Sequence, residues 1–166
     1  MSGLKAGDAF PEGVSFTYVA PTGELDLTAC GLGIQYDASK EFMDKKVVLV
    51  AVPGAFTPTC QEQHVPSYLA NLDKLKAKGV DQVIFIASND HWVMSAWGKA
   101  NGVKDESILF MSDPGTAFSK SIGWTQGDRT LRYAIVVDHG KVTYAEVDSV
   151  RGSIANTGAE GVLAKL

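Results

Sequence analysis

A hydroxyl and a thiol lie close together in a stretch that reads Pro-Gly-Ala-Phe-Thr-Pro-Thr-Cys, from Pro53 to Cys60. Thr57 and Pro58 are typical of a helix start, with a hydroxyl at the N-cap and a ring at the first helical position. Cys60 then lies in the first turn, among unpaired backbone N–H groups at the positive end of the helix dipole. That environment favours a thiolate, so Cys60 is a candidate nucleophile.

The segments on either side of this stretch must position it. Residues Val47–Val52 are almost all aliphatic, which predicts a strand buried on both faces, and Pro53 with Gly54 ends it. The helix that begins near Cys60 continues to Gly79. Pro66 interrupts its pattern and predicts a kink near residues 62–65.

The remaining patterns alternate between strands and helices. The first part of the chain predicts a short edge strand over 14–19, a second hairpin arm that includes or precedes Leu25–Cys30, and a short helix over 37–44. The middle predicts strands over 83–87 and 108–111, with a helix capped by Asn89-Asp90 between them. The last part predicts a short helix after Asp113-Pro114, a hairpin over 131–147 and a final helix over 157–166. This order predicts one α/β domain, residues 1–166, in which helices flank a mixed central sheet and the N-terminal hairpin is an extension.

Composition excludes several classes of function. The chain has 166 residues, 45% of them hydrophobic and 20% charged, which is ordinary for a globular domain. Its 15 basic and 19 acidic residues give a net charge of -4 without a basic run, so we expect no nucleic-acid partner. We find no apolar stretch long enough for a membrane span and no secretory signal, so we expect an intracellular protein. Two cysteines are too few for a disulfide scaffold.

The spacing of Pro53, Thr57 and Cys60, P-x-x-x-T-x-x-C, resembles the active-site motif of the peroxiredoxins. The fuller string PGAFTPTC is similar to the type II, or peroxiredoxin-5-like, subfamily, and the resemblance extends from Gly7 to Leu166. It implies a thioredoxin-like fold and a thiol peroxidase that reduces hydrogen peroxide and organic hydroperoxides. It also implies a homodimer without metal or organic cofactor, reduced by thioredoxin, glutaredoxin or glutathione.

Peroxide reduction needs a thiolate, donors for the two oxygens and a positive charge near the leaving oxygen. Cys60 supplies the sulfur, Thr57 a hydroxyl, and Pro53 a pocket wall that has no N–H to compete for the thiolate. The resemblance implies that a guanidinium completes the site and places Arg132 in that role, with Arg129 as the alternative.

His64 lies four residues after Cys60 and therefore on the same helix face. It is either a pocket residue that donates a proton or a polar residue of the wall. The Cys60–His64 pair also raises two rival chemistries, acyl transfer by a cysteine–histidine pair and metal binding. The first lacks an evident group to orient the histidine, and the second matches no zinc spacing.

A cysteine oxidised by peroxide becomes a sulfenic acid, which then needs a second thiol. The positions at which the subfamily carries this resolving cysteine are occupied here by Phe85 and, near the C-terminus, Ser153. Cys30 is the only other thiol, and some fungal alkyl hydroperoxide reductases of the subfamily have a cysteine at a comparable place. Our hypothesis is that Cys30 resolves Cys60 through a disulfide between subunits; the alternative is direct reduction by an external thiol.

The tripeptide Ala164-Lys165-Leu166 resembles the Ser-Lys-Leu peroxisomal address, which indicates a peroxisomal location, with the cytoplasm as the alternative. It could equally be the frayed end of an amphipathic helix. A function from another class also stays open: a redox sensor or holdase of the same fold, in which oxidation of Cys60 signals without turnover.

Overall fold

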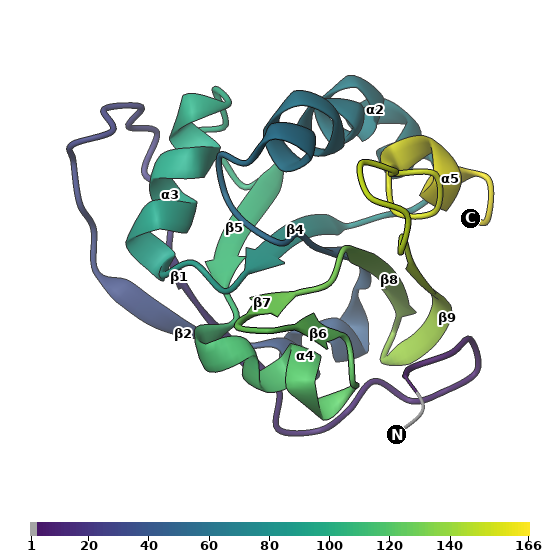
Figure 1. Ribbon diagram of the computed structural model, residues 1–166. Helices are drawn as coiled ribbons and strands as arrows, with labels where there is room; N and C mark the ends of the chain where they lie inside the picture. Colours follow the sequence, from purple (N-terminus) through teal and green to yellow (C-terminus); the bar gives the residue numbers. More distant parts are fainter. Residues whose placement is uncertain (1–2) are drawn as a thin grey trace.

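A seven-stranded mixed sheet forms the middle layer of the computed structural model, which describes residues 3–166 (Figure 1). The strand order is β2-β1-β5-β4-β3-β8-β9. The strands are β1 (Ser15–Val19), β2 (Gly33–Asp37), β3 (Lys46–Ala51), β4 (Gln82–Ala87), β5 (Ile108–Ser112), β8 (Tyr133–Asp138) and β9 (Lys141–Val147). A separate small hairpin, which the sequence analysis did not predict, joins β6 (Thr125–Gln126) and β7 (Arg129–Thr130).

Helices cover both faces of the sheet. On one face lie α2 (Val65–Ala77), α3 (His91–Ala100) and α5 (Ala159–Leu163). On the other lie α1 (Ala38–Glu41), the 3-10 turn η1 (Phe42–Asp44) and α4 (Ala117–Ser121), which follows the turn η3 (Pro114–Thr116). Each face has its own apolar cluster. The predicted mixed sheet flanked by helices is confirmed, and the fold is thioredoxin-like.

The three central strands β3, β4 and β5 are parallel, and α2 and α3 are their crossovers. Nearly every residue of these strands is buried, because both faces are covered, as parallel sheets require. The next strand, β8, runs antiparallel to β3 and pairs Tyr133 with Ala51. The start of β8 therefore lies beside the end of β3, where the Pro53–Cys60 stretch begins.

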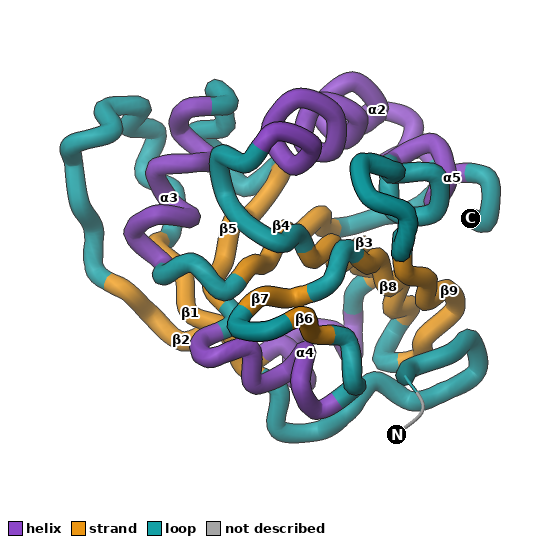
Figure 2. The backbone as a smooth tube through the Cα atoms, in the orientation of Figure 1, coloured by secondary structure: helices purple, strands orange, loops and turns teal. Residues whose placement is uncertain are grey.

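The N-terminal hairpin differs from the prediction. The strand near residues 14–19 is not at the edge, because β1 pairs with β2 on one side and with β5 on the other. The edge strand is β2, which exposes four of its five residues. The second arm does not contain Leu25–Cys30: these residues lie in the connection between the arms, a long loop that runs past α3 (Figure 2).

The distortion predicted ahead of Pro66 is present as the π-helical turn η2 (Cys60–His64), in which the Val65 N–H donates to the Cys60 carbonyl. Proline has no N–H, and its ring crowds the carbonyl four residues earlier, so a widened turn accommodates it. The predicted hairpin is confirmed as β8 and β9, joined through His139 and Gly140 with positive φ. The final helix is shorter than predicted and ends at Leu163. Within residues 3–166, no helix is both long and apolar enough to cross a bilayer.

Candidate active site

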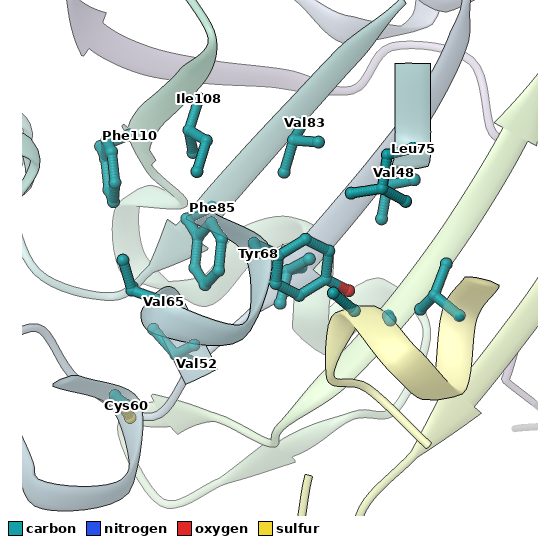
Figure 3. Packing of buried hydrophobic residues seen from close by; sticks show 14 of the residues in the cluster. Val48, Val52, Cys60, Val65, Tyr68, Leu75, Val83, Phe85, Ile108 and Phe110 are labelled. Carbon is teal, nitrogen blue, oxygen red and sulfur yellow. The ribbon is translucent and has the colours of Figure 1, made fainter. Parts of the chain in front are cut away.

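Cys60 lies at the start of the helical segment that leads into α2, with only 1% of its surface exposed. It belongs to the apolar cluster between the sheet and α2, α3 and α5. Figure 3 shows it at one end of this cluster, away from the central rings of Phe85 and Tyr68. The predicted helix start is confirmed, because helical structure begins at Pro58. The Cys60 sulfur is thus held against the core of the protein.

The loop that precedes Cys60 is fixed by polar contacts at several points. The Thr57 hydroxyl donates to the Gly54 carbonyl at 2.7 Å, which closes the loop on itself, so the predicted side-chain cap of the helix is replaced by a loop contact. The Ala55 N–H donates to Asn89 Oδ1 at 2.9 Å, so the end of β4 supports the loop. Phe56 has a φ of 62°, a conformation that non-glycine residues adopt only where their surroundings hold them.

The first helical turn is fastened to α3 through Gln61. Its Oε1 accepts from the Trp97 indole N–H at 2.6 Å, and its amide nitrogen donates to Asn101 Oδ1 at 2.7 Å. The Gln61 backbone N–H donates to the Thr57 carbonyl at 2.8 Å. The residue next to Cys60 is therefore bound on both its main chain and its side chain, which restricts where the sulfur can point.

Arg132, the residue before β8, reaches the sulfur from the adjacent strand. Its Nη2 donates to Cys60 Sγ at 3.4 Å and its Nη1 donates to His64 Nδ1 at 2.8 Å. The side chain is almost buried, with 9% of the residue exposed. The Thr130 hydroxyl donates to the Val52 carbonyl at 2.9 Å and ties this segment to the end of β3. Arg129, the alternative candidate, is exposed, and its guanidinium lies near Gly54.

His64 is fully buried and uses both ring nitrogens. Nε2 lies 2.9 Å from the Thr157 carbonyl, to which it can only donate, so Nδ1 is the nitrogen that accepts from Arg132. Burial lowers the pKa of His64 to about 4; the Arg132 charge acts in the same direction, against the opposing bond to Thr157. The ring is therefore neutral at physiological pH. Its one proton points at a backbone carbonyl, so His64 orients Arg132 and has no proton to give to a substrate.

The contacts of His64 argue against one of the two rival chemistries, acyl transfer. Acyl transfer needs a histidine that takes the proton from sulfur, but the Nδ1 lone pair of His64 is engaged by Arg132. For metal binding, residues 3–166 contain no group of three or more His, Cys, Asp or Glu side chains that could hold an ion. The contacts around Cys60 are those of a thiol beside a fixed positive charge.

Cys30 lies elsewhere. It is exposed in the β1–β2 connection, and both cysteines are free thiols. This loop is held on α3 by Lys99, whose Nζ donates to the carbonyls of Asp26 at 3.1 Å and Ala29 at 2.7 Å, and by the Trp92 indole N–H, which donates to the Gly31 carbonyl. The structure thus brings Cys60, Thr57 and Arg132 together, with Pro53 in the same loop, and leaves Cys30 apart.

Some residues that shape the site were missed from the sequence. Asn89 was predicted to cap α3 together with Asp90; Asp90 alone accepts from the Val93 N–H, and Asn89 holds the active-site loop. The sequence could have separated the two roles, because an N-cap side chain accepts from the N–H two or three residues later, and Asp90 stands three residues before Val93. Thr157 carries no such signal, because its contact with His64 is made by a backbone carbonyl 93 residues away.

The buried neutral His64 predicts a pH dependence of stability. Its pKa is about 4 in the folded state and 6.5 in the unfolded chain, so the unfolded state binds more protons between these values. Stability gained from the neutral ring is complete above about pH 6.5 and is lost as the pH falls toward 4, by on the order of 3 kcal/mol. His64→Gln keeps one donor and one acceptor without titrating and should flatten this part of the profile. Urea unfolding from pH 4.5 to 7.5 measures the difference; parallel profiles for the two proteins would contradict the assignment.

Comparison with known proteins identifies the family of this chain. Residues 5–163 match the family model described as Redoxin. Peroxiredoxin AHP1 of Chaetomium thermophilum is 62% identical over 166 residues, covering 100% of this chain and 96% of that protein. A putative peroxisomal peroxiredoxin of Lipomyces kononenkoae is 51% identical and covers 96% of this chain and 99% of its own length.

Solved structures give the same result. Reduced Prx3 of Vibrio vulnificus, in complex with hydrogen peroxide, superposes with a TM-score of 0.81 at 37% identity, covering 97% of this chain and 94% of the other. Peroxiredoxin 5 of Alvinella pompejana superposes with a TM-score of 0.77 at 26% identity, covering 98% and 97%. The chain therefore belongs to the Redoxin family and, within it, to the peroxiredoxins, the thiol-dependent peroxidases.

Proposed function

We propose that Cys60 is the cysteine of this peroxidase that reacts with peroxide. The observation that supports this most directly is the 3.4 Å contact between Arg132 Nη2 and Cys60 Sγ. A guanidinium this close to sulfur is placed to stabilise negative charge on the departing oxygen. Because the pair is nearly buried, this charge is less screened than it would be in water.

In the proposed step the Cys60 thiolate attacks one oxygen of ROOH and the O–O bond breaks. Sulfur keeps the OH as a sulfenic acid, and the other oxygen leaves as RO⁻, which takes a proton from water to give ROH. The Thr57 hydroxyl proton is engaged by Gly54, so this oxygen offers its lone pairs to the peroxide O–H. Pro53 forms a wall of the site and has no N–H that could compete for the thiolate. Hydrogen peroxide and organic hydroperoxides both fit this scheme.

The reaction of reduced protein with hydroperoxide, followed by tryptophan fluorescence in a stopped-flow instrument, tests the assignment. We expect a rate constant several orders above that of a free thiol, no fast reaction in Cys60→Ser, and a loss of about 100-fold in Arg132→Gln. Arg129→Gln is the matched comparison, since it removes the same charge three residues away. A fast reaction that persists in Cys60→Ser would overturn the proposal. A wild-type rate in Arg132→Gln, with the loss in Arg129→Gln instead, would overturn the role given to Arg132.

We further propose that Cys30 resolves the sulfenic acid of Cys60 in the partner subunit of a homodimer. The Cys30 thiolate attacks the sulfenic sulfur, a disulfide forms, and the OH leaves as water after taking up a proton. Exposure of Cys30 on a loop held mainly by polar contacts supports this role, because such a loop can move. Thioredoxin, glutaredoxin or glutathione would then reduce the disulfide.

Non-reducing gels of peroxide-treated protein test this step. Wild type should give a disulfide-linked dimer that neither Cys30→Ser nor Cys60→Ser can form. Cys30→Ser should keep the fast peroxide reaction but lose turnover with thioredoxin. A dimer band that persists in Cys30→Ser and depends on Cys60 would rule Cys30 out as the resolving cysteine.

For the location, we propose the peroxisome, with the cytoplasm as the alternative. The support is the similarity to a protein named as a peroxisomal peroxiredoxin, together with the resemblance of Ala164-Lys165-Leu166 to a peroxisomal address. These residues follow the end of α5, and Ala164 and Lys165 are exposed. A fluorescent protein fused ahead of Met1 should collect in peroxisomes and become diffuse when the tripeptide is removed. A diffuse signal from both fusions would favour the cytoplasm.

A further inference from the structure

The irregular segment after β9 is tied to the active site by a closed ring of hydrogen bonds. The Asp148 N–H donates to the Arg132 carbonyl at 3.0 Å. The Asp148 carboxylate accepts from the Thr157 N–H at 2.8 Å and from its hydroxyl at 2.7 Å. The Thr157 carbonyl accepts from His64, which in turn accepts from Arg132 Nη1. The ring thus begins at the main chain of Arg132 and ends at its side chain.

The position of the Thr157 carbonyl depends on side chains rather than on regular structure. Residues 148–158, all of which the structure describes, contain neither helix nor strand. Asp148 also accepts from the Asn156 N–H at 3.1 Å, so one carboxylate gathers two successive backbone amides and a hydroxyl. Thr157 is fully buried, and its carbonyl takes a second bond from the Tyr68 hydroxyl at 2.7 Å. Asp148 therefore makes the hydrogen bonds to the main chain and side chain of Thr157, while Tyr68 bonds its carbonyl directly.

The direction of that carbonyl matters because it selects the tautomer of His64. Arginine offers only N–H donors, so Nδ1 of His64 must carry a lone pair to accept from it. The bond from Nε2–H to the Thr157 carbonyl holds the proton on the other nitrogen. If the carbonyl moved, a proton on Nδ1 would face the Arg132 N–H, and the guanidinium would be pushed from its place beside Cys60.

We propose that Asp148 is a positioning residue of the peroxidase site. It fixes the Thr157 carbonyl, which fixes the His64 tautomer and so holds Arg132 Nη2 on Cys60. The inference rests on the role proposed above for Arg132. It differs from a purely structural role for Asp148, which would stabilise the loop after β9 without changing the state of the His64 ring.

The Asp148→Asn variant tests the proposal, because it keeps the shape but replaces one acceptor oxygen with a donor that faces Thr157. We expect the rate constant with hydroperoxide to fall about tenfold while the far-ultraviolet circular dichroism is retained. Long-range ¹⁵N–¹H spectra should show His64 as one tautomer in wild type and as a mixture in Asp148→Asn. Glu146→Gln is the matched control, an exposed carboxylate on β9 two residues away, and should match wild type in both measurements.

A double-mutant comparison shows whether Asp148 acts through His64. His64→Leu removes both ring bonds, so adding Asp148→Asn to it should cause no further loss; a second tenfold loss would show that Asp148 acts otherwise. If Arg132→Gln is slow while Asp148→Asn keeps one tautomer and the wild-type rate, the inference is wrong and the proposed function stands. If Arg132→Gln reacts at the wild-type rate, the role proposed for Arg132 fails, and with it the positioning role of Asp148. A fast reaction in Cys60→Ser would overturn the proposed function itself.

Thr157→Val provides a test if Asp148→Asn does not fold, because it removes only the hydroxyl and keeps the amide and the carbonyl. We expect a smaller loss in the same direction, about threefold, since one charge-assisted hydrogen bond of the ring is removed. An unchanged rate together with an unchanged His64 spectrum in a folded Thr157→Val protein would contradict the proposal.

Discussion

A guanidinium that cannot lose its proton is held between a buried sulfur and a buried neutral imidazole. Arg132 keeps its charge under all ordinary conditions, so placing it in the interior requires acceptors on its inward side. Cys60 and His64 are these acceptors, and they come from one helical turn. That turn is π-helical, and both of its side chains contact the same guanidinium. Loss of either acceptor would leave one nitrogen of the buried guanidinium without its hydrogen-bond partner.

The sheet topology explains how the charge of Arg132 reaches the thiol of Cys60. Cys60 and Arg132 are 72 residues apart in sequence. Because β8 runs antiparallel to β3, the residue before β8 lies beside the loop that leaves β3. Parallel strands place their following loops at one edge of the sheet, and the Asn89 side chain at the end of β4 supports the Cys60 loop from there. The thiol of Cys60, the charge of Arg132 and the contacts that hold them therefore lie together at the carboxyl ends of the central parallel strands.

Part of the fold and of the site could be predicted from short stretches of the sequence. Thr57-Pro58 marked the helix start, and the aliphatic run before Pro53 marked the central strand, because each signal lies within a few residues of its consequence. The pairing of Arg132 with Cys60 was suggested only by resemblance, since no short-range pattern encodes a contact between strands. The N-terminal strand was placed wrongly at the edge because alternation reports buried faces, whereas edge pairing depends on which strand arrives next. The partner of His64, a carbonyl in irregular chain, leaves no mark in the sequence.

The burial of Cys60 separates the two halves of the proposed cycle. A peroxide is a small molecule, whereas a disulfide with Cys30 requires the two Cα atoms to come within about 7 Å. The turn that carries Cys60 is held by core packing, by Gln61 and by Arg132, whereas the loop that carries Cys30 is exposed and held chiefly by Lys99 and Trp92. Local opening is cheapest where few apolar contacts must break. The Cys30 loop is therefore the element expected to move first, because the contacts that hold the Cys60 turn leave the movement to the loop of the other thiol.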